Sequence, residues 1–164
     1  MNYEEAVREA KSANLRPVYL VVGEERVLVD RVVSSLRKAA LLGGIDGFNE
    51  DKLTAGETDV DRIVSTAKTV PMMAKKRFVL VRSVEKWDGG GGDDESAASQ
   101  KAAGSMEKLT AYASAPVDST CMVLVASKLD GRRKLMALAR KQGFLVQCDP
   151  IARNALPNFI EKAA

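Results

Sequence analysis

The sequence predicts an α/β domain with a five-stranded, mostly parallel sheet flanked by helices, and two observations carry this prediction. First, short continuous apolar runs recur along the chain, and such runs are typical of strands that a parallel sheet buries on both faces. Second, segments with the spacing of amphipathic helices alternate with these runs. Because parallel strands need a crossover between them, this alternation indicates a sheet covered by helices on both faces.

Five segments are expected to form the strands. Pro17 opens the first apolar run and Gly23 ends it. A weaker signal runs from about Phe48 to Leu53 and stands before the polar stretch TAGETDVD. The predicted strands are 17–22, 48–53, 77–81, 121–126 and 144–148.

Five other segments have apolar side chains at helical spacing and alternate with the strands. Gly43 and Gly44 are expected to end the second of these helices. Asp59 or its neighbour Thr58 is a suitable N-cap for the third. Pro71 is expected to close the third helix, because a residue before proline disfavours the α conformation. The predicted helices are 3–10, 26–41, 60–67, 106–113 and 132–142.

The chain is expected to consist of one domain and the beginning of another. Residues 1–150 hold all the predicted strands and form the α/β domain. The stretch ALPNFIEKAA at 155–164 starts a helical pattern with little chain left to pack against it. We therefore expect residues 151–164 to begin a truncated helical domain.

Residues 88–105 are rich in Gly, Ser and Asp, and this composition predicts a flexible surface insertion. Four consecutive glycines in it could cradle a phosphate. However, Asp88, Asp93, Asp94 and Glu95 surround them with negative charge. A solvated linker is the favoured interpretation.

The composition excludes several classes of function. The chain contains no histidine, which removes His-dependent catalytic triads and the common zinc sites. Cys121 and Cys148 lie in apolar runs without CxxC spacing and are expected to be buried thiols in a reducing cytoplasm. No apolar run approaches the roughly 18 residues that span a bilayer. We expect a cytoplasmic protein without membrane contact, metal, cofactor or catalytic residues.

The turn after the first strand lacks the chemistry of a phosphate-binding loop. Such loops follow the pattern GxxxxGK[ST], in which bare amides and a lysine meet the anion. Here Leu28, Val29 and Asp30 occupy the places of the second glycine, the lysine and the hydroxyl. Glu24 and Glu25 would repel phosphate. The third strand also ends without a carboxylate to hold magnesium. The sequence therefore predicts that ATP does not bind here.

Met72 and Met73 stand side by side after Pro71, at the junction between a helix and a strand. Methionine packs adaptably, so both side chains could fill a gap in the core. Methionine is also favoured at surfaces that fit an apolar pocket, and two adjacent side chains can hardly both point into one core. Both interpretations stay open on these residues alone.

The stretch GRRK at 131–134 places Arg132, Arg133 and Lys134 at the expected start of a helix, where the helix dipole disfavours cations. An anionic partner could compensate this charge, and a solvated basic turn is the simpler alternative. With Arg140 and Lys141, these residues could form a DNA contact. The net charge of +3 is too small to indicate nucleic-acid binding alone.

Several long stretches, taken in order, resemble one protein family. They are YLVVGEERVLVDRVVSSLRKA, FNEDKLTAGETDVDRIVSTAKTVPMMAKKRFVLVRSVEKW, LVASKLDGRRKLMALARKQGFLVQC and LPNFI. Together they resemble the N-terminal domain of the delta subunit of the bacterial DNA polymerase III clamp loader. The resemblance covers the chain apart from residues 88–105, and it consists of many modest matches.

The resemblance implies an AAA+/RecA-like N-terminal domain without a functional P-loop. In this family the delta subunit binds the ring-shaped sliding clamp, the beta subunit, and holds it open for loading during DNA replication. It belongs to a DNA polymerase holoenzyme, but no catalytic activity is expected in this chain. Lid and collar domains, missing here, join it to the other clamp-loader subunits. The alternative is a DNA-binding module of a replication or repair complex that uses the basic 131–141 region.

The resemblance also implies where the clamp would bind. The clamp-binding element of the family lies on the loop before the third strand, which corresponds to Val70, Pro71, Met72 and Met73. Family members commonly carry a leucine-phenylalanine type pair where this chain has two methionines. An adjoining basic rim would consist of Lys75, Lys76 and Arg77.

Overall fold

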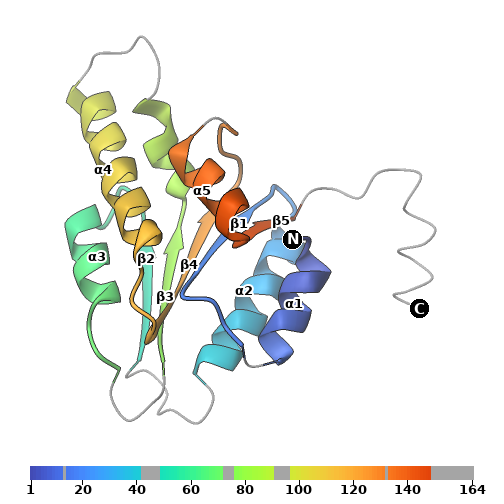
Figure 1. The fold of residues 1–164 in the computed structure, drawn as a ribbon. Coiled ribbons are helices and arrows are strands. Elements are labelled where there is room, and N and C mark those ends of the chain that lie inside the picture. Colours follow the sequence, from blue (N-terminus) through green and yellow to red (C-terminus); the bar gives the residue numbers. More distant parts are fainter. Residues whose placement is uncertain (13, 42–48, 72–75, 91–96, 132, 149–164) are drawn as a thin grey trace, which may run out of the picture.

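A single parallel sheet organises the domain (Figure 1). The computed structural model describes residues 1–12, 14–41, 49–71, 76–90, 97–131 and 133–148, with the backbone alone at 88–90 and 97–100. Its five strands lie in the order β2-β3-β4-β1-β5, and each pairing is parallel. The strands are β1 Val18–Val22, β2 Glu50–Thr54, β3 Arg77–Arg82, β4 Thr120–Ala126 and β5 Leu145–Gln147.

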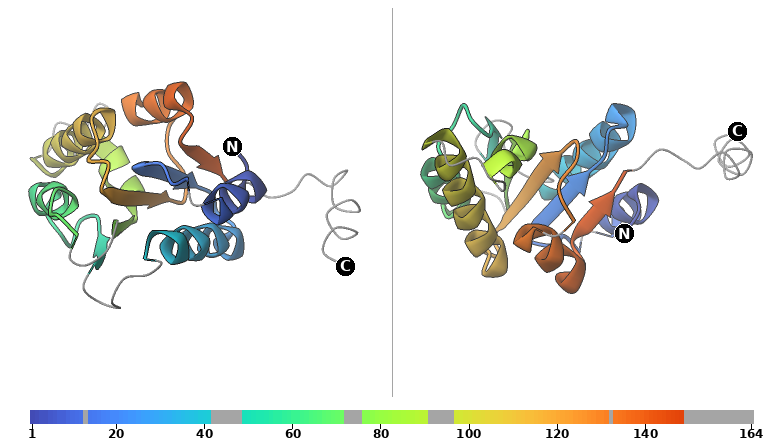
Figure 2. Two further views of the ribbon diagram at one scale, coloured as in Figure 1. Left: turned by 60° about the horizontal axis from the view of Figure 1, so that its bottom comes forward. Right: turned by 90° about the horizontal axis from the view of Figure 1, so that it is seen from above.

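Helices cover both faces of the sheet, which confirms the predicted fold class (Figure 2). Helices α1 and α2 lie on one face, and α3, α4 and α5 lie on the other. The helices are α1 Tyr3–Lys11, α2 Arg26–Ala40, α3 Val60–Ala67, α4 Ala97–Ser114 and α5 Lys134–Gln142, and a 3-10 helix, η1, spans Val84–Gly90. Among the helices described, none is long and apolar enough to cross a bilayer.

The core has two layers because side chains alternate along each strand. Val79 and Val81 of β3 pack toward α3, α4 and α5, whereas Phe78 and Leu80 pack toward α1 and α2. All 7 residues of the central strand β4 are buried. Cys121 belongs to this strand, and burial raises the pKa of its thiol to about 12. Cys121 and Cys148 are both buried, as predicted.

The predicted boundaries around α3 and β2 differ from the structure. Helix α3 ends at Ala67 and is capped by Lys68, so Pro71 does not end it. Asp59 does occupy the N-cap position of α3, but its side chain makes no capping hydrogen bond. The weak strand lies at Glu50–Thr54 rather than at 48–53.

The flexible insertion predicted at 88–105 is wrong for its second half. Helix α4 begins at Ala97, and Ser105 is buried within it. The stretch AASQKAAGS is rich in alanine, which has the highest helix propensity, and that propensity outweighs its serines and glycine. Residues 91–96, with the glutamate and two of the aspartates noted above, lie outside the described residues, as does the predicted start of a helical domain at 151–164.

Candidate interaction loop and sheet-end crevice

The connection between α3 and β3 lies at the end of the sheet where the parallel strands begin (Figure 1). It spans residues 68–76, and we refer to it as the interaction loop. Val70 in this loop is 74% exposed, and Val27 is the other large apolar side chain exposed among the described residues. Pro71 is half-buried. The predicted methionine pair, 72–73, and the rim residue Lys75 lie outside the described part of the chain.

Arg77 does not join the predicted basic rim, because its side chain turns into the domain. The residue is 8% exposed. Its Nη1 donates a hydrogen bond of 2.5 Å to Oδ2 of Asp51, and its Nε donates one of 3.2 Å to the carbonyl of Thr69. The guanidinium therefore joins strand β2 to the first part of the interaction loop.

The register of the sheet explains why Asp51 meets Arg77. Asp51 pairs with Val79, so it lies diagonally across from Arg77 in the neighbouring strand. Val79 and Arg77 are two residues apart and point to the same face, toward α3 and α4. A strand shifted by one residue would move Arg77 to the opposite face.

The first residue of β4 and the turn before it contact both ends of the connection between α3 and β3. The hydroxyl of Thr120 donates a buried hydrogen bond of 2.6 Å to the carbonyl of Ala67, the last residue of α3. At the other end of the loop, Nζ of Lys76 donates to the carbonyl of Asp118 at 2.9 Å. The backbone of Arg77 bonds to Ser119 at 2.9 Å. Both ends of the connection are therefore held by the segment 118–120.

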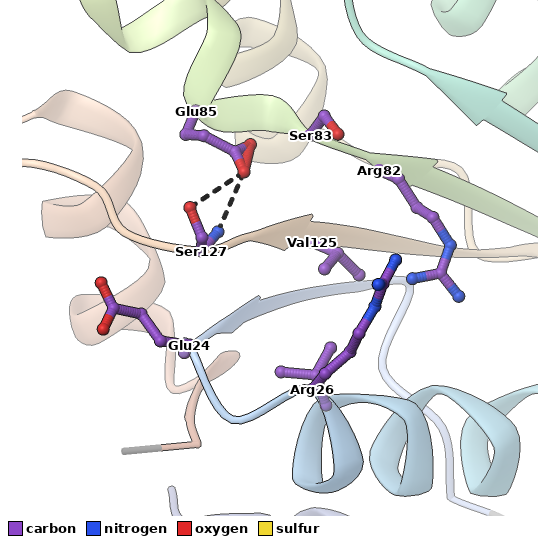
Figure 3. Close-up of a pocket in the computed structure, with 9 residues that line it drawn as sticks. Glu24, Arg26, Arg82, Ser83, Glu85, Val125 and Ser127 are labelled. Atoms are coloured by element: carbon purple, nitrogen blue, oxygen red, sulfur yellow. Dashed lines mark hydrogen bonds between the residues drawn. The ribbon is translucent and has the colours of Figure 1, made fainter. Parts of the chain in front are cut away.

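A crevice lies at the opposite end of the sheet, beyond the carboxyl ends of β1, β3 and β4 (Figure 3). Strand β1 leads into α2 on one face, and β4 leads toward α5 on the other, which is where open α/β sheets hold their ligands. The crevice has a volume of about 320 Å³. The polar residues lining it are Glu24, Arg26, Arg82, Ser83, Glu85 and Ser127.

The crevice does not have the backbone of a phosphate-binding loop. Only Gly23, Glu24 and Glu25 stand between the end of β1 and the start of α2, whereas a phosphate loop needs a longer run of free amides. A Cβ on Gly23 would lie 2.4 Å from the carbonyl oxygen of Cys148. This glycine is therefore required for close packing against the chain that follows β5.

Side chains around the crevice also bond to one another. Oε1 of Glu85 accepts hydrogen bonds from Oγ of Ser127 at 3.0 Å and from its backbone N–H at 3.2 Å (Figure 3). Arg82 forms an ion pair of 3.7 Å with Asp30. In the described part of the chain, no group of three acidic, cysteine or histidine side chains is placed to hold a metal ion.

Of the basic residues predicted to contact DNA, Arg133 and Lys134 lie where α5 begins, at the end of the sheet away from the interaction loop. Arg133 is the N-cap of α5, and Lys134 begins this helix and is exposed. Nη1 of Arg140 donates a hydrogen bond of 3.0 Å to the carbonyl of Gly131. The guanidinium of Arg140 is therefore hydrogen-bonded within the domain, to the turn before α5. Residue 132, the first of the predicted contacts, lies outside the described residues.

Sequence reasoning missed the internal role of Arg77. The available signal was an acidic residue at the predicted neighbouring strand, but only the register shows that the two side chains share a face. The adjacent lysines suggested a common solvent-facing position for all three cations.

The fold and the short turn after β1 define the class: an α/β domain with a five-stranded parallel sheet and no phosphate loop between β1 and α2. The family model for the DNA polymerase III delta subunit matches residues 19–149, and this chain belongs to that family. It is 25% identical over 154 residues to DNA polymerase III subunit delta of Bacillus subtilis strain 168, covering 93% of this chain and 43% of the relative.

Two solved structures have a similar fold. The Bacillus subtilis DNA clamp loader delta protein YqeN matches with a TM-score of 0.79 and 24% identity, over 96% of this chain and 45% of that protein. A DNA polymerase III gamma subunit-related protein of Thermotoga maritima matches with a TM-score of 0.58 and 11% identity, over 99% of this chain and 50% of that protein. The chain thus spans less than half the length of the curated relative.

Proposed function

We propose that this chain is the clamp-binding domain of a clamp-loader delta subunit, an AAA+-like domain that binds the sliding clamp and helps to open it without hydrolysing ATP. Its partners are the clamp and, through other parts of the delta subunit, the remaining loader subunits in the cytoplasm. The observation that carries this proposal is the exposed side chain of Val70, 74% accessible on a loop whose ends are hydrogen-bonded to the body of the domain. Family membership supports the same role.

The apolar surface of the loop would supply much of the affinity. Burying each methionine of the pair Met72 and Met73 contributes roughly 1.5–3 kcal/mol, and Val70 adds a contribution of similar size. Micromolar binding corresponds to about 8 kcal/mol, so the three side chains together approach it. Lys76, and Lys75 beside it, would add contacts to an acidic rim. Arg77 is already engaged inside the domain.

Clamp opening would follow from differential binding. If the clamp can make the contacts with the loop only in its open conformation, the free energy of these contacts shifts the ring toward the open state. Moving an equilibrium from 1:99 to 99:1 takes about 5.5 kcal/mol, which lies within the total that the three apolar side chains contribute; the part spent on opening the ring does not also appear as affinity. The chain would make and break no covalent bond in this process.

Two exposed valines provide a matched test of the loop. Val70→Asp, and separately the double change Met72→Ala with Met73→Ala, should each weaken binding of the purified clamp at least tenfold, because a contact worth about 1.4 kcal/mol or more is lost. Val27→Asp is the control, since Val27 is 76% exposed at the start of α2, near the opposite end of the sheet. Surface plasmon resonance measures the affinity, and circular dichroism confirms the fold.

The same experiment separates clamp binding from the alternative of DNA binding. Undiminished clamp affinity in both loop variants would contradict the proposed surface. Binding to duplex DNA that falls steeply with salt, depends on Lys134 and persists in the methionine double variant would favour the DNA-binding module instead.

A further inference from the structure

We infer that Arg77 is a positioning residue for clamp binding: its buried guanidinium holds the start of the interaction loop, at Thr69, in place without touching the clamp. This inference rests on the proposed function of the loop. Arg77 is the first residue of β3, and its side chain reaches back to Thr69, near the start of the loop that it ends. It therefore closes the loop with its own side chain.

The planar fork of arginine suits this task. Nη1 bonds to Asp51 at 2.5 Å while Nε bonds to the carbonyl of Thr69 at 3.2 Å, so one side chain contacts strand β2 and the loop together. The donors of guanidinium are fixed in one plane, whereas the lysine ammonium is a compact point charge on a flexible stem. A lysine at this position would keep an ion pair with Asp51 but would lose the defined bond to the loop.

Burial makes the contact strong enough to fix a loop. The side chain of Arg77 is 10% exposed and that of Asp51 is 32% exposed, so solvent screens this pair less than an ordinary surface pair. The C-terminal end of α3, which leads into the loop, is held by the buried hydrogen bond from Thr120 to the carbonyl of Ala67. Together these bonds fix residues 67 and 69, immediately before the exposed side chain of Val70.

A loop held in place loses less conformational freedom when it binds. An unanchored segment of this length samples many orientations, and ordering it on the clamp would oppose binding. With Thr69 held, the chain leaves the body of the domain at Val70 in a defined direction. Arg77 would therefore strengthen clamp binding through loop order, although no clamp atom contacts it.

The chain offers a matched control at Glu50, the residue of β2 before Asp51. Arg37 of α2 donates from Nε and Nη2 to the two oxygens of Glu50 at 2.5 and 2.8 Å. This pair has the same chemistry as the pair of Arg77 and Asp51, but it lies on the α2 face of the sheet. Arg37→Lys therefore removes a comparable fork without touching the interaction loop.

The test compares Arg77→Lys, Asp51→Asn and Arg37→Lys in the full 164-residue chain. Surface plasmon resonance with the purified clamp gives the affinity, amide hydrogen exchange reports loop order, and thermal melts show that each variant is folded. We expect Arg77→Lys to weaken clamp binding about tenfold, because the free energy of one charge-assisted hydrogen bond that orders the loop is lost. Asp51→Asn should weaken binding less, because the bond to Thr69 remains. Both should speed exchange at residues 70–76. Arg37→Lys should leave binding and loop exchange unchanged.

Each outcome bears on the inference. Clamp binding by Arg77→Lys equal to that of the wild type, or equal losses in Arg77→Lys and Arg37→Lys, would overturn the positioning role and leave the proposed function standing. If Arg77→Lys fails to fold, the clamp affinity of Asp51→Asn is compared with those of the wild type and Arg37→Lys, and the same criteria apply. A wild-type chain that does not bind the clamp would overturn the proposed function and this inference together.

Discussion

Arg37 and Arg77 each form an ion pair with a carboxylate of β2, and the two pairs lie on opposite faces of the sheet. Arg37 pairs with Glu50, and Arg77 pairs with Asp51. Adjacent residues of a strand point to opposite faces, so one fork joins β2 to α2 and the other joins it to the interaction loop. Strand β2 is an edge strand with few apolar residues, and these ion pairs fix its position where hydrophobic burial is small.

The pair on the α2 face predicts a pH dependence of stability. Hydrogen bonds from Arg37 lower the pKa of the Glu50 carboxyl below its usual value of 4.5. As the pH falls, the unfolded chain takes up this proton before the folded one, so the stabilisation is present above about pH 4.5 and is lost as the pH falls through the lowered pKa.

Glu50→Gln should therefore lower the free energy of unfolding by about 1 kcal/mol at pH 7, and the difference from the wild type should shrink toward pH 3. Urea titrations between pH 3 and pH 7 measure it. The exposed Glu57 serves as control, since Glu57→Gln should produce no such trend. A deficit of Glu50→Gln that stays constant with pH would mean that the charge of Glu50 does not stabilise the fold.

At the scale of elements, two glycines illustrate opposite requirements. Gly23 ends β1 against the carbonyl of Cys148, where a Cβ would lie 2.4 Å from the backbone oxygen. Gly104 lies inside helix α4, and a Cβ there would meet no atom within 4 Å. The first glycine allows a close approach of two segments, while the second weakens a helix without serving its packing.

Gly23→Ala should destabilise the domain by about 3 kcal/mol, because backbone on one side must shift. Gly104→Ala should stabilise it by about 0.5–1 kcal/mol through helix propensity. Chemical denaturation of both variants measures the two effects. A mild effect of Gly23→Ala would show that the turn after β1 has room to move, and it would weaken the argument that this turn is too confined to form a phosphate loop.

Helix α4 shows how composition can mislead at this scale. The Gly, Ser and Asp content of 88–105 predicted a linker, yet Ala97 begins a helix of 18 residues. This helix packs on η1, α3 and α5, and its buried residues Met106 and Leu109 belong to the core. Packing of the second half of the helix, together with alanine-rich sequence in the first half, sustains the whole element.

At the scale of the whole molecule, the interaction loop and the crevice lie at opposite ends of the sheet. The loop precedes β3, and the crevice follows β1, β3 and β4. Sites separated by the length of the strands act independently unless a shared element couples them. The proposed function uses only the end that carries the interaction loop.

The crevice should not bind ATP with magnesium. Its turn offers Gly23, Glu24 and Glu25 in place of a phosphate loop, and Glu24 adds negative charge where the phosphates would lie. A ligand at 100 times its dissociation constant stabilises a protein by about 2.7 kcal/mol, so binding would be evident as a raised melting temperature. We expect no shift at millimolar ATP and no heat in calorimetric titration. Saturable heat that Arg82→Ala abolishes would show that the crevice is a nucleotide site.

The sequence by itself determined the fold class, the alternation of strands and helices, and the absence of phosphate-loop chemistry after β1. These depend on local features: apolar runs, helical periodicity and the residue types of one turn, all of which the chain shows without folding. The resemblance to the delta subunit family arose from the same stretches, and the family match over residues 19–149 confirms it.

Only the tertiary structure decided where Arg77 points, which carboxylate it meets and how the interaction loop is held. These depend on strand order and register, which bring Asp51 of β2 and the turn before β4 beside the end of α3. No local pattern encodes the pairing of segments far apart in the chain, and a shift of one residue would exchange the faces of every side chain in the strand. The direction of one arginine is therefore a property of the assembled sheet.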